Sequence, residues 1–98
     1  MNRLDQNQST AFQLAQSAMA DLKVAVRMLL AEAPKQGLTN AQIGRTLGIY
    51  AGHVKHVGHI SRTILELLRS DGVAEQDGER GPWRLIDHTE TDAPQRDE

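Results

Sequence analysis

No glycine or proline occurs before Pro34, and this uninterrupted stretch constrains the fold more than any other feature of the sequence. Apolar residues recur within it at alternating steps of three and four, which is the spacing of one face of an α-helix. The stretch is also rich in Ala, Gln and Leu, which favour helix. It predicts a helix that ends near Glu32, with one apolar stripe formed by Phe12, Ala15, Met19, Leu22, Val26, Leu29 and Ala33.

Two positions compete as helix starts in this stretch. Thr10 opens a Thr-x-x-Gln capping box with Gln13, and Asp21 is suited to cap a second helix after a break. A single helix would be about 35 Å long, more than a small domain covers, so we expect its first half to project. An uncovered stripe there needs a partner, and a second copy is the simplest one. The alternative is that the helix folds back on its own domain.

A second capping box, Thr39-Asn40-Ala41-Gln42, predicts a short helix that buries Ile43 and Leu47 and ends at Gly48. A third helix follows and ends at Asp71-Gly72. Its start lies either near Gly58, with 53–57 as a loop, or near His53. Its apolar stripe is predicted to contain Val57, Ile60, Ile64, Leu67 and Leu68.

The segment 72–87 predicts a β-hairpin, with strands at Val73–Gln76 and Trp83–Ile86. The pairs Asp77-Gly78 and Gly81-Pro82 between them are turn signals. Side chains alternate along a strand, so Trp83 and Leu85 share one face and Arg84 lies on the other.

Composition excludes several protein classes. The 98 residues are enough for one domain, and the absence of cysteine excludes disulfides and thiolate metal sites. No apolar run is long enough to cross a membrane, and the N-terminus lacks the apolar segment of a secretory signal. We therefore expect a cytoplasmic protein.

The net charge of −2 is unevenly distributed. Residues 87–98 carry five acids and one arginine, whereas residues 1–86 carry ten bases and eight acids. The polar tail 87–98 lacks apolar periodicity and is predicted to be disordered. Within 45–69, four basic residues stand against Glu66 alone, so this segment is mildly basic.

Three histidines, His53, His56 and His59, raise the question of a metal site. In helical phase they spread over about 120°, and no Asp, Glu or Cys in the stretch completes a ligand set. We expect no metal and no other cofactor. The chain also lacks a Gly-rich phosphate loop, a cysteine nucleophile and paired carboxylates in an apolar setting, so we expect no enzymatic activity.

The order of these elements resembles the winged helix-turn-helix family. The resemblance covers residues 21–86 and rests on three motifs: LTNAQIGRTLGI, ISRTILELLRSDGV and VAEQDGERGPWRL. A short strand at Leu38-Thr39 completes the pattern, but the segment between the two central helices is longer than the family's usual turn. The resemblance implies a mainly α fold with a small β-hairpin wing, preceded by a long N-terminal helix. Residues 1–20 are then a helical extension, expected to mediate homodimerisation, and 87–98 the tail.

In this family the second helix of the motif enters the DNA major groove and the wing touches the backbone or the minor groove. The resemblance therefore implies a small transcriptional regulator that binds double-stranded DNA through a recognition helix at about 54–70 and a wing at 73–86. The alternative is a winged helix that docks a protein partner. Helix-terminal N–H groups at Thr39 and Asn40 suit a phosphate. The remaining residues expected near DNA are Lys55, His56, His59, Ser61, Arg62, Thr63, Arg80 and Arg84.

Overall fold

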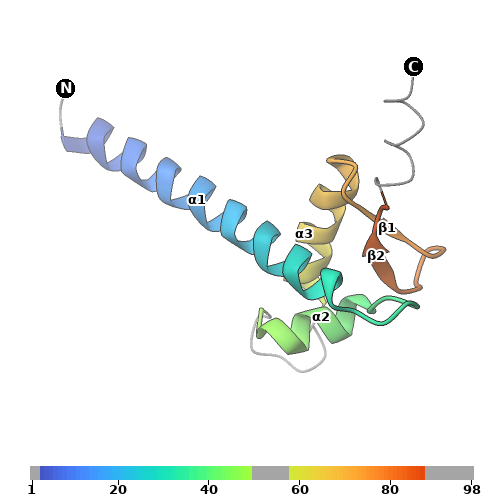
Figure 1. The fold of residues 1–98 in the computed structure, drawn as a ribbon. Coiled ribbons are helices and arrows are strands. Elements are labelled where there is room, and N and C mark those ends of the chain that lie inside the picture. The colour runs from blue at the N-terminus through green and yellow to red at the C-terminus, as the bar shows by residue number, and fades with distance from the viewer. Residues whose placement is uncertain (1–2, 50–57, 88–98) are drawn as a thin grey trace, which may run out of the picture.

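A computed structural model describes residues 3–49 and 58–87 of the chain. The fold is mainly α, with a long N-terminal helix, two further helices and a C-terminal β-hairpin, as the sequence predicts. Figure 1 shows the long helix running out from a body formed by the other elements. Lys55, His56 and residues 88–98 lie outside the described residues. The elements are α1 (Arg3–Ala31), α2 (Asn40–Leu47), α3 (His59–Ser70), β1 (Ala74–Gln76) and β2 (Trp83–Leu85).

Helix α1 starts earlier than the capping box at Thr10 predicts, and it has no break at Asp21. Thr10 lies inside the helix, because nothing in the segment before it stops a helix from extending to Arg3. Asp5 in the first turn suits the positive end of the helix dipole. The helix ends at Ala31, within one residue of the predicted end. At about 1.5 Å per residue it is roughly 43 Å long.

Only the C-terminal half of α1 contacts the body. Every residue of segment 3–18 is exposed, whereas Val26 and Leu30 are buried. Met19, Leu22 and Leu29 are partly buried against the core. The predicted stripe is therefore covered from Met19 onward, and its first large residue, Phe12, is 64% exposed.

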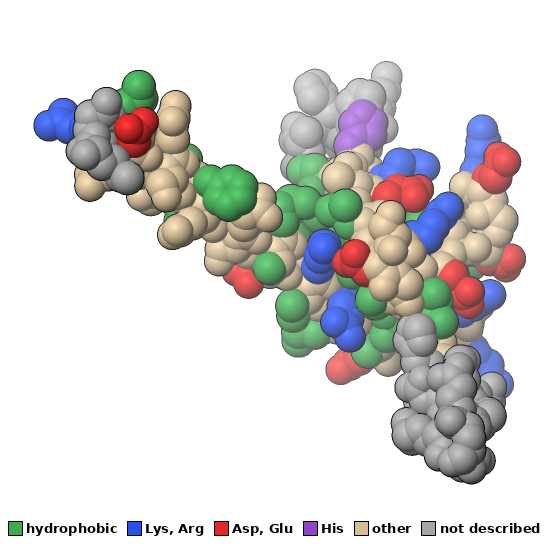
Figure 2. Space-filling model, turned by 90° about the horizontal axis from the view of Figure 1, so that it is seen from above, with side chains coloured by type: hydrophobic (Ala, Val, Ile, Leu, Met, Phe, Trp, Pro, Cys, Tyr) green, Lys and Arg blue, Asp and Glu red, His purple; other side chains and the backbone are tan. Residues whose placement is uncertain are grey.

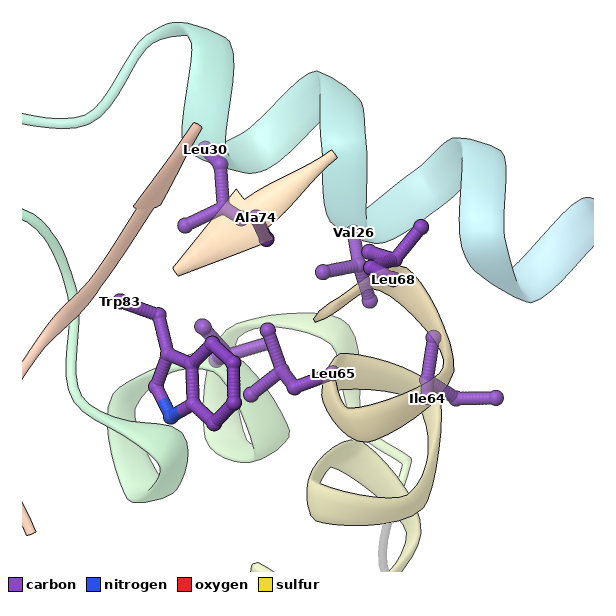
Figure 3. Close-up of a cluster of buried hydrophobic side chains, with 8 residues drawn as sticks. Val26, Leu30, Ile64, Leu65, Leu68, Ala74 and Trp83 are labelled. Carbon is purple, nitrogen blue, oxygen red and sulfur yellow. The ribbon is translucent and has the colours of Figure 1, made fainter. Parts of the chain in front are cut away.

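The core is aliphatic, with one aromatic side chain inside it. Trp83 of β2 is 1% exposed and faces Leu65 of α3, as Figure 3 shows. Trp83 therefore anchors the hairpin on the helices. The buried set comprises Val26, Leu30, Ile43, Ile64, Leu65, Leu68, Ala74 and Trp83. Burial of a valine, leucine or isoleucine side chain stabilises a fold by about 1.5–3 kcal/mol.

The hairpin is antiparallel, with Ala74 opposite Leu85 and Gln76 opposite Trp83. Its strands agree with the predicted ones to within a residue at each end, and the Ile86 N–H still donates to Val73 O at 2.9 Å. Leu38 pairs with Trp83 on the far side of β2 through two backbone hydrogen bonds of 2.9 and 2.6 Å. This confirms a short strand-like segment at Leu38.

Candidate nucleic-acid interface

The amino end of α2 is fixed by the predicted capping box. The Gln42 N–H donates to Thr39 Oγ1 at 3.1 Å, and the Thr39 N–H donates to Gln42 Oε1 at 2.8 Å. At the other end, Gly48 has φ +70°, the left-handed conformation that a helix C-cap needs. Local signals in the sequence thus set both ends of α2.

A polar node joins the amino ends of α2 and α3. Asn40 Nδ2 donates to the Gly58 carbonyl at 2.8 Å, and Ser61 Oγ donates to Asn40 Oδ1 at 2.6 Å. The Ser61 hydroxyl also lies 3.1 Å from the Asn40 carbonyl and 3.3 Å from the Gly58 carbonyl. A Cβ on Gly58 would collide with the Asn40 amide, so the two helix ends approach as closely as a glycine permits. This node sets how α3 is presented relative to α2.

The position of Ser61 corrects the prediction that it lies on the DNA-reading face. Its side chain is 0% exposed and its hydroxyl is used inside the node, so it is not available to a phosphate or a base. The side chain of Asn40 is engaged there too. The inner face of α3 consists of Ser61, Ile64, Leu65 and Leu68, a spacing of i, i+3, i+4 and i+7.

The predicted stripe of α3 was rotated relative to this face. It included Ile60, which is 37% exposed, and omitted Leu65, which is fully buried. The helix begins at His59, directly after Gly58, as the later of the two predicted starts requires. The interval 48–58 between α2 and α3 is much longer than the roughly 3–4-residue turn of a helix-turn-helix motif.

The outer face of α3 presents three of the predicted contact residues, His59, Arg62 and Thr63, all exposed. The Arg62 guanidinium has no hydrogen-bond or ion-pair partner within residues 3–49 and 58–87. Thr63 Oγ1 donates to the His59 carbonyl one turn earlier at 3.2 Å, and a hydroxyl that donates once can still accept a hydrogen bond. The outer face of α3 thus presents hydrogen-bond donors and acceptors, while the opposite face of the helix packs against the core.

Arg69, at the other end of α3, has a structural role. Its guanidinium carbon lies 4.7 Å from the centroid of the Trp83 ring, and Nη2 donates to Gln76 Oε1 at 2.9 Å. Its Nε atom also lies 3.6 Å from Oε1 of Glu66, one turn earlier, in an ion pair. Arg69 therefore braces the hairpin on α3, and no local pattern in the sequence indicates the stacking on Trp83.

The two predicted hairpin contacts differ in their surroundings. Arg80 is exposed in the turn between β1 and β2. Arg84 lies opposite Glu75 on the face away from Trp83, and their Nε and Oε2 atoms are 3.6 Å apart. Both partners are about half exposed, so this pair is worth at most ~1 kcal/mol after solvent screening. It partly neutralises Arg84.

Charges of both signs are mixed over the body. In the face of Figure 2, basic and acidic side chains alternate over the body and do not gather in one basic patch. The segment 58–87 carries four arginines and six acids, the acids being Glu66, Asp71, Glu75, Asp77, Glu79 and Asp87. In the described part of the chain, no three His, Asp or Glu side chains are grouped to hold a metal ion. No helix there has the length and apolar content needed to span a bilayer.

Comparison of the chain with protein-family models, with curated proteins and with solved structures gives no match in any of the three. The architecture itself is three helices followed by a two-stranded antiparallel hairpin that packs on them. This arrangement is compatible with a winged helix.

Proposed function

We propose that the chain binds double-stranded DNA through the outer face of α3 and acts as a small transcriptional regulator of winged helix-turn-helix type. One observation carries the proposal: the inner face of α3 is packed in the core, while Arg62 is exposed on the outer face without a hydrogen-bond or ion-pair partner among the described residues. Because the helix is already folded and packed, binding has to order only the side chains that make the contacts.

Each exposed residue has a chemical role in this proposal. Arg62 can donate two parallel hydrogen bonds to guanine O6 and N7, which is worth about 1–3 kcal/mol of discrimination. His59 and Thr63 flank it and suit phosphates or base edges. Arg80 and Arg84 would contact the backbone from the hairpin, with Arg84 exchanging its pairing to Glu75 for a phosphate.

The other residues predicted to contact DNA are not part of the exposed face of α3 that the structure describes. Lys55 and His56 precede α3 in the chain, lie outside the described residues and stay predictions. The side chains of Asn40 and Ser61 become positioning groups, because they fix the amino end of α3 and do not face outward. The capping box occupies Thr39, so a phosphate at α2 would meet the backbone N–H groups of its first turn.

Fluorescence anisotropy on a random duplex, at about 50 and about 200 mM salt, tests the proposal. We expect micromolar affinity that falls steeply with salt. Arg62→Ala should weaken binding to this random sequence at least about fivefold and reduce the salt slope by about one, as expected for loss of one basic contact to the duplex. Arg27→Ala removes the same charge from an exposed site on α1 and should change affinity less than about threefold. Equal losses in the two variants, or no binding at low salt, would refute the proposal.

The mixed charge of the hairpin favours a second candidate, docking of a protein partner. Glu75 pairs with Arg84, and Asp77 and Glu79 are exposed in the same hairpin as Arg80, so duplex DNA would be repelled in part. A photoreactive residue at position 63, compared with one at the exposed position 46 of α2, distinguishes the candidates. Cross-links to DNA from position 63 alone support the first, and cross-links to one protein from position 63 alone support the second.

A further inference from the structure

Helix α1 carries a second row of mainly apolar residues, here called the seam, which is separate from the stripe facing the core. Its positions alternate at steps of three and four along the whole helix, the strict 3.5-residue period of a coiled-coil seam. All are exposed except Ala25, which is partly buried, and the largest of them, Leu4, Leu14 and Met28, are 62–66% exposed. The seam consists of Leu4, Asn7, Ala11, Leu14, Ala18, Asp21, Ala25 and Met28.

This seam differs from the stripe that contains Phe12. The Phe12 stripe passes through Met19 and Val26 into the core, so its C-terminal half is already covered by the chain's own body. Phe12 lies roughly 160° around the helix axis from Leu14. The seam, in contrast, remains accessible from one end of α1 to the other, and Figure 2 shows exposed hydrophobic side chains along this projecting helix.

A hollow lies at the C-terminal end of the seam. Four residues at i, i+3, i+4 and i+7 line it, three from α1 and one from the turn directly after it, together with Leu47 of α2. Four residues at this spacing form the hole that accepts one side chain, the knob, of a facing helix in a coiled coil. The hollow has a volume of about 340 Å³, and these four residues are Ala25, Met28 and Leu29 of α1 and Glu32 just beyond its end.

We propose that two copies of the chain pair through α1 in an antiparallel arrangement, with Leu4 of each copy seated in the hollow of the other. In a two-fold pair, each residue i faces a residue whose number makes a constant sum with i. Seating Leu4 against Met28 fixes that sum at 32. The same sum places Leu14 opposite Ala18 and Ala11 opposite Asp21, so the two-fold axis passes between positions 14 and 18.

The seam is self-complementary in this register, which identifies the occupant as a second copy. The large side chain Leu14 faces the small Ala18, and the polar Asn7 and Asp21 each face an alanine, so no two polar groups oppose one another. Large-against-small pairing lets helices pack without voids. Polar residues at seam positions reduce stability but fix the register and direction of pairing.

The projecting half of α1, segment 3–18, also needs a partner to be a stable helix. Segment 3–18 has no buried residue, and isolated helices of about 12–15 residues are marginal in water. The seam is about 36 Å long, and a strip one helix wide, ~10 Å, covers on the order of 400 Å² on each copy. That is about half of the ~800 Å² per partner in a standard interface, so we expect a micromolar dissociation constant.

Sedimentation velocity from about 1 µM to about 1 mM chain, without DNA, tests the pairing. We expect a monomer–dimer equilibrium that Leu14→Asp weakens at least about tenfold, because an aspartate would be buried opposite Ala18. Phe12→Asp is the matched control, since its parent side chain is 64% exposed against 66% for Leu14, and it should shift the equilibrium less than about threefold. Trp83 fluorescence reports whether the body stays folded in both variants. A monomer at every concentration, or greater weakening by Phe12→Asp, would overturn the proposal.

Disulfide trapping tests the direction of pairing. The chain has no cysteine, so Leu4→Cys with Met28→Cys introduces the only two. Within one rigid helix they lie about 36 Å apart, far beyond the ~7 Å between Cα atoms that a disulfide spans. We expect the double variant to form a covalent dimer under mild oxidation and each single variant to stay monomeric. Cross-linking of either single variant would indicate parallel pairing, and either that result or no cross-link in the double variant would overturn the proposal. Because DNA is absent, neither result depends on the proposed function.

Discussion

The two halves of α1 form one continuous helix in opposite surroundings. Residues 3–18 are all exposed, whereas residues 19–31 bury Val26 and Leu30 and cover the core with three further side chains. Ten of the thirteen residues in the second half are apolar, against six of sixteen in the first. The helix itself continues through both, because Gly and Pro are absent from the entire stretch.

A periodic apolar stripe suggests both a helical backbone and a buried face, and the two halves of α1 show that the first can occur without the second. Helical spacing requires only local backbone geometry, whereas burial requires another element at the right place. The stripe from Phe12 to Leu29 has the same spacing throughout, but only its second half meets the body. Substitutions that are chemically alike should therefore have unlike effects in the exposed half and in the body.

The largest expected difference is between two leucines of α1. Leu30→Ala should reduce the free energy of unfolding by about 2–5 kcal/mol, because Leu30 is 5% exposed and its loss leaves a cavity. Leu14→Ala should change it by less than ~0.5 kcal/mol at about 0.1 µM chain, well below the expected dissociation constant, where the proposed dimer is largely dissociated. Urea unfolding followed by Trp83 fluorescence measures both. Similar losses in the two variants would mean that the free half is packed after all.

A pair of glycines gives the next largest difference. Gly37 and Gly78 both have positive φ, +88° and +72°, so alanine costs each about 1–2 kcal/mol of backbone strain. A Cβ at Gly37 would also collide with the Trp83 carbonyl, whereas nothing lies within 4 Å of one at Gly78. We expect Gly37→Ala to cost a further ~1–3 kcal/mol in thermal or urea unfolding. Equal costs would show that Leu38 and Trp83 are not held as closely as their pairing indicates.

Two hydroxyls of α3 extend the comparison to polar groups. Ser61→Ala removes the central donor of a buried node and leaves Asn40 Oδ1 without it, which should cost about 1–3 kcal/mol. Thr63→Ala removes an exposed hydroxyl bonded only to its own helix and should change stability by no more than ~0.5 kcal/mol. Both are measured by urea unfolding. If Ser61→Ala left the free energy of unfolding unchanged, apolar contacts alone would position α3.

The smallest expected effect concerns the ion pair that joins α1 to the end of α3. Lys23 Nζ and Asp71 Oδ2 lie 3.0 Å apart, but the two side chains are 33% and 47% exposed. Solvent screening limits such a pair to about 0–1 kcal/mol. A double-mutant cycle with Lys23→Gln and Asp71→Asn should give a coupling energy in that range that falls with added salt. A coupling well above it would indicate that charge, as well as apolar burial, anchors this half of α1.

Much of the fold is predictable from local patterns. The capping box at Thr39, the left-handed Gly48 and the turn signals of the hairpin each act through neighbours in the chain, so the sequence places α2 and both strands to within a residue. The capping box at Thr10 failed as a start signal, because the residues before it also support helix. A pattern that permits a helix start does not prevent an earlier one.

The candidate site was predicted less well, for a physical reason. Arg62 and Thr63 are on the outer face of α3 as expected, but Ser61 is on the inner face. Helical periodicity alone did not determine which side of α3 faces the core, because Ile60, Leu65 and Leu67 are all apolar and do not share one side of the helix. Only the partner at Asn40, 21 residues earlier in the chain, decides that Ser61 faces inward.

The sequence by itself determined that three helices and a hairpin form, the caps of α2 and the strands of the hairpin, since these depend on contacts between residues close in the chain. The tertiary structure decided which half of α1 is covered, which face of α3 is free and that Arg69 stacks on Trp83. Each of these depends on where distant segments meet, as with Lys23 and Asp71, 48 residues apart. Local sequence patterns do not predict such tertiary contacts, because the packing energy depends on both elements in contact and cannot be derived from either one alone.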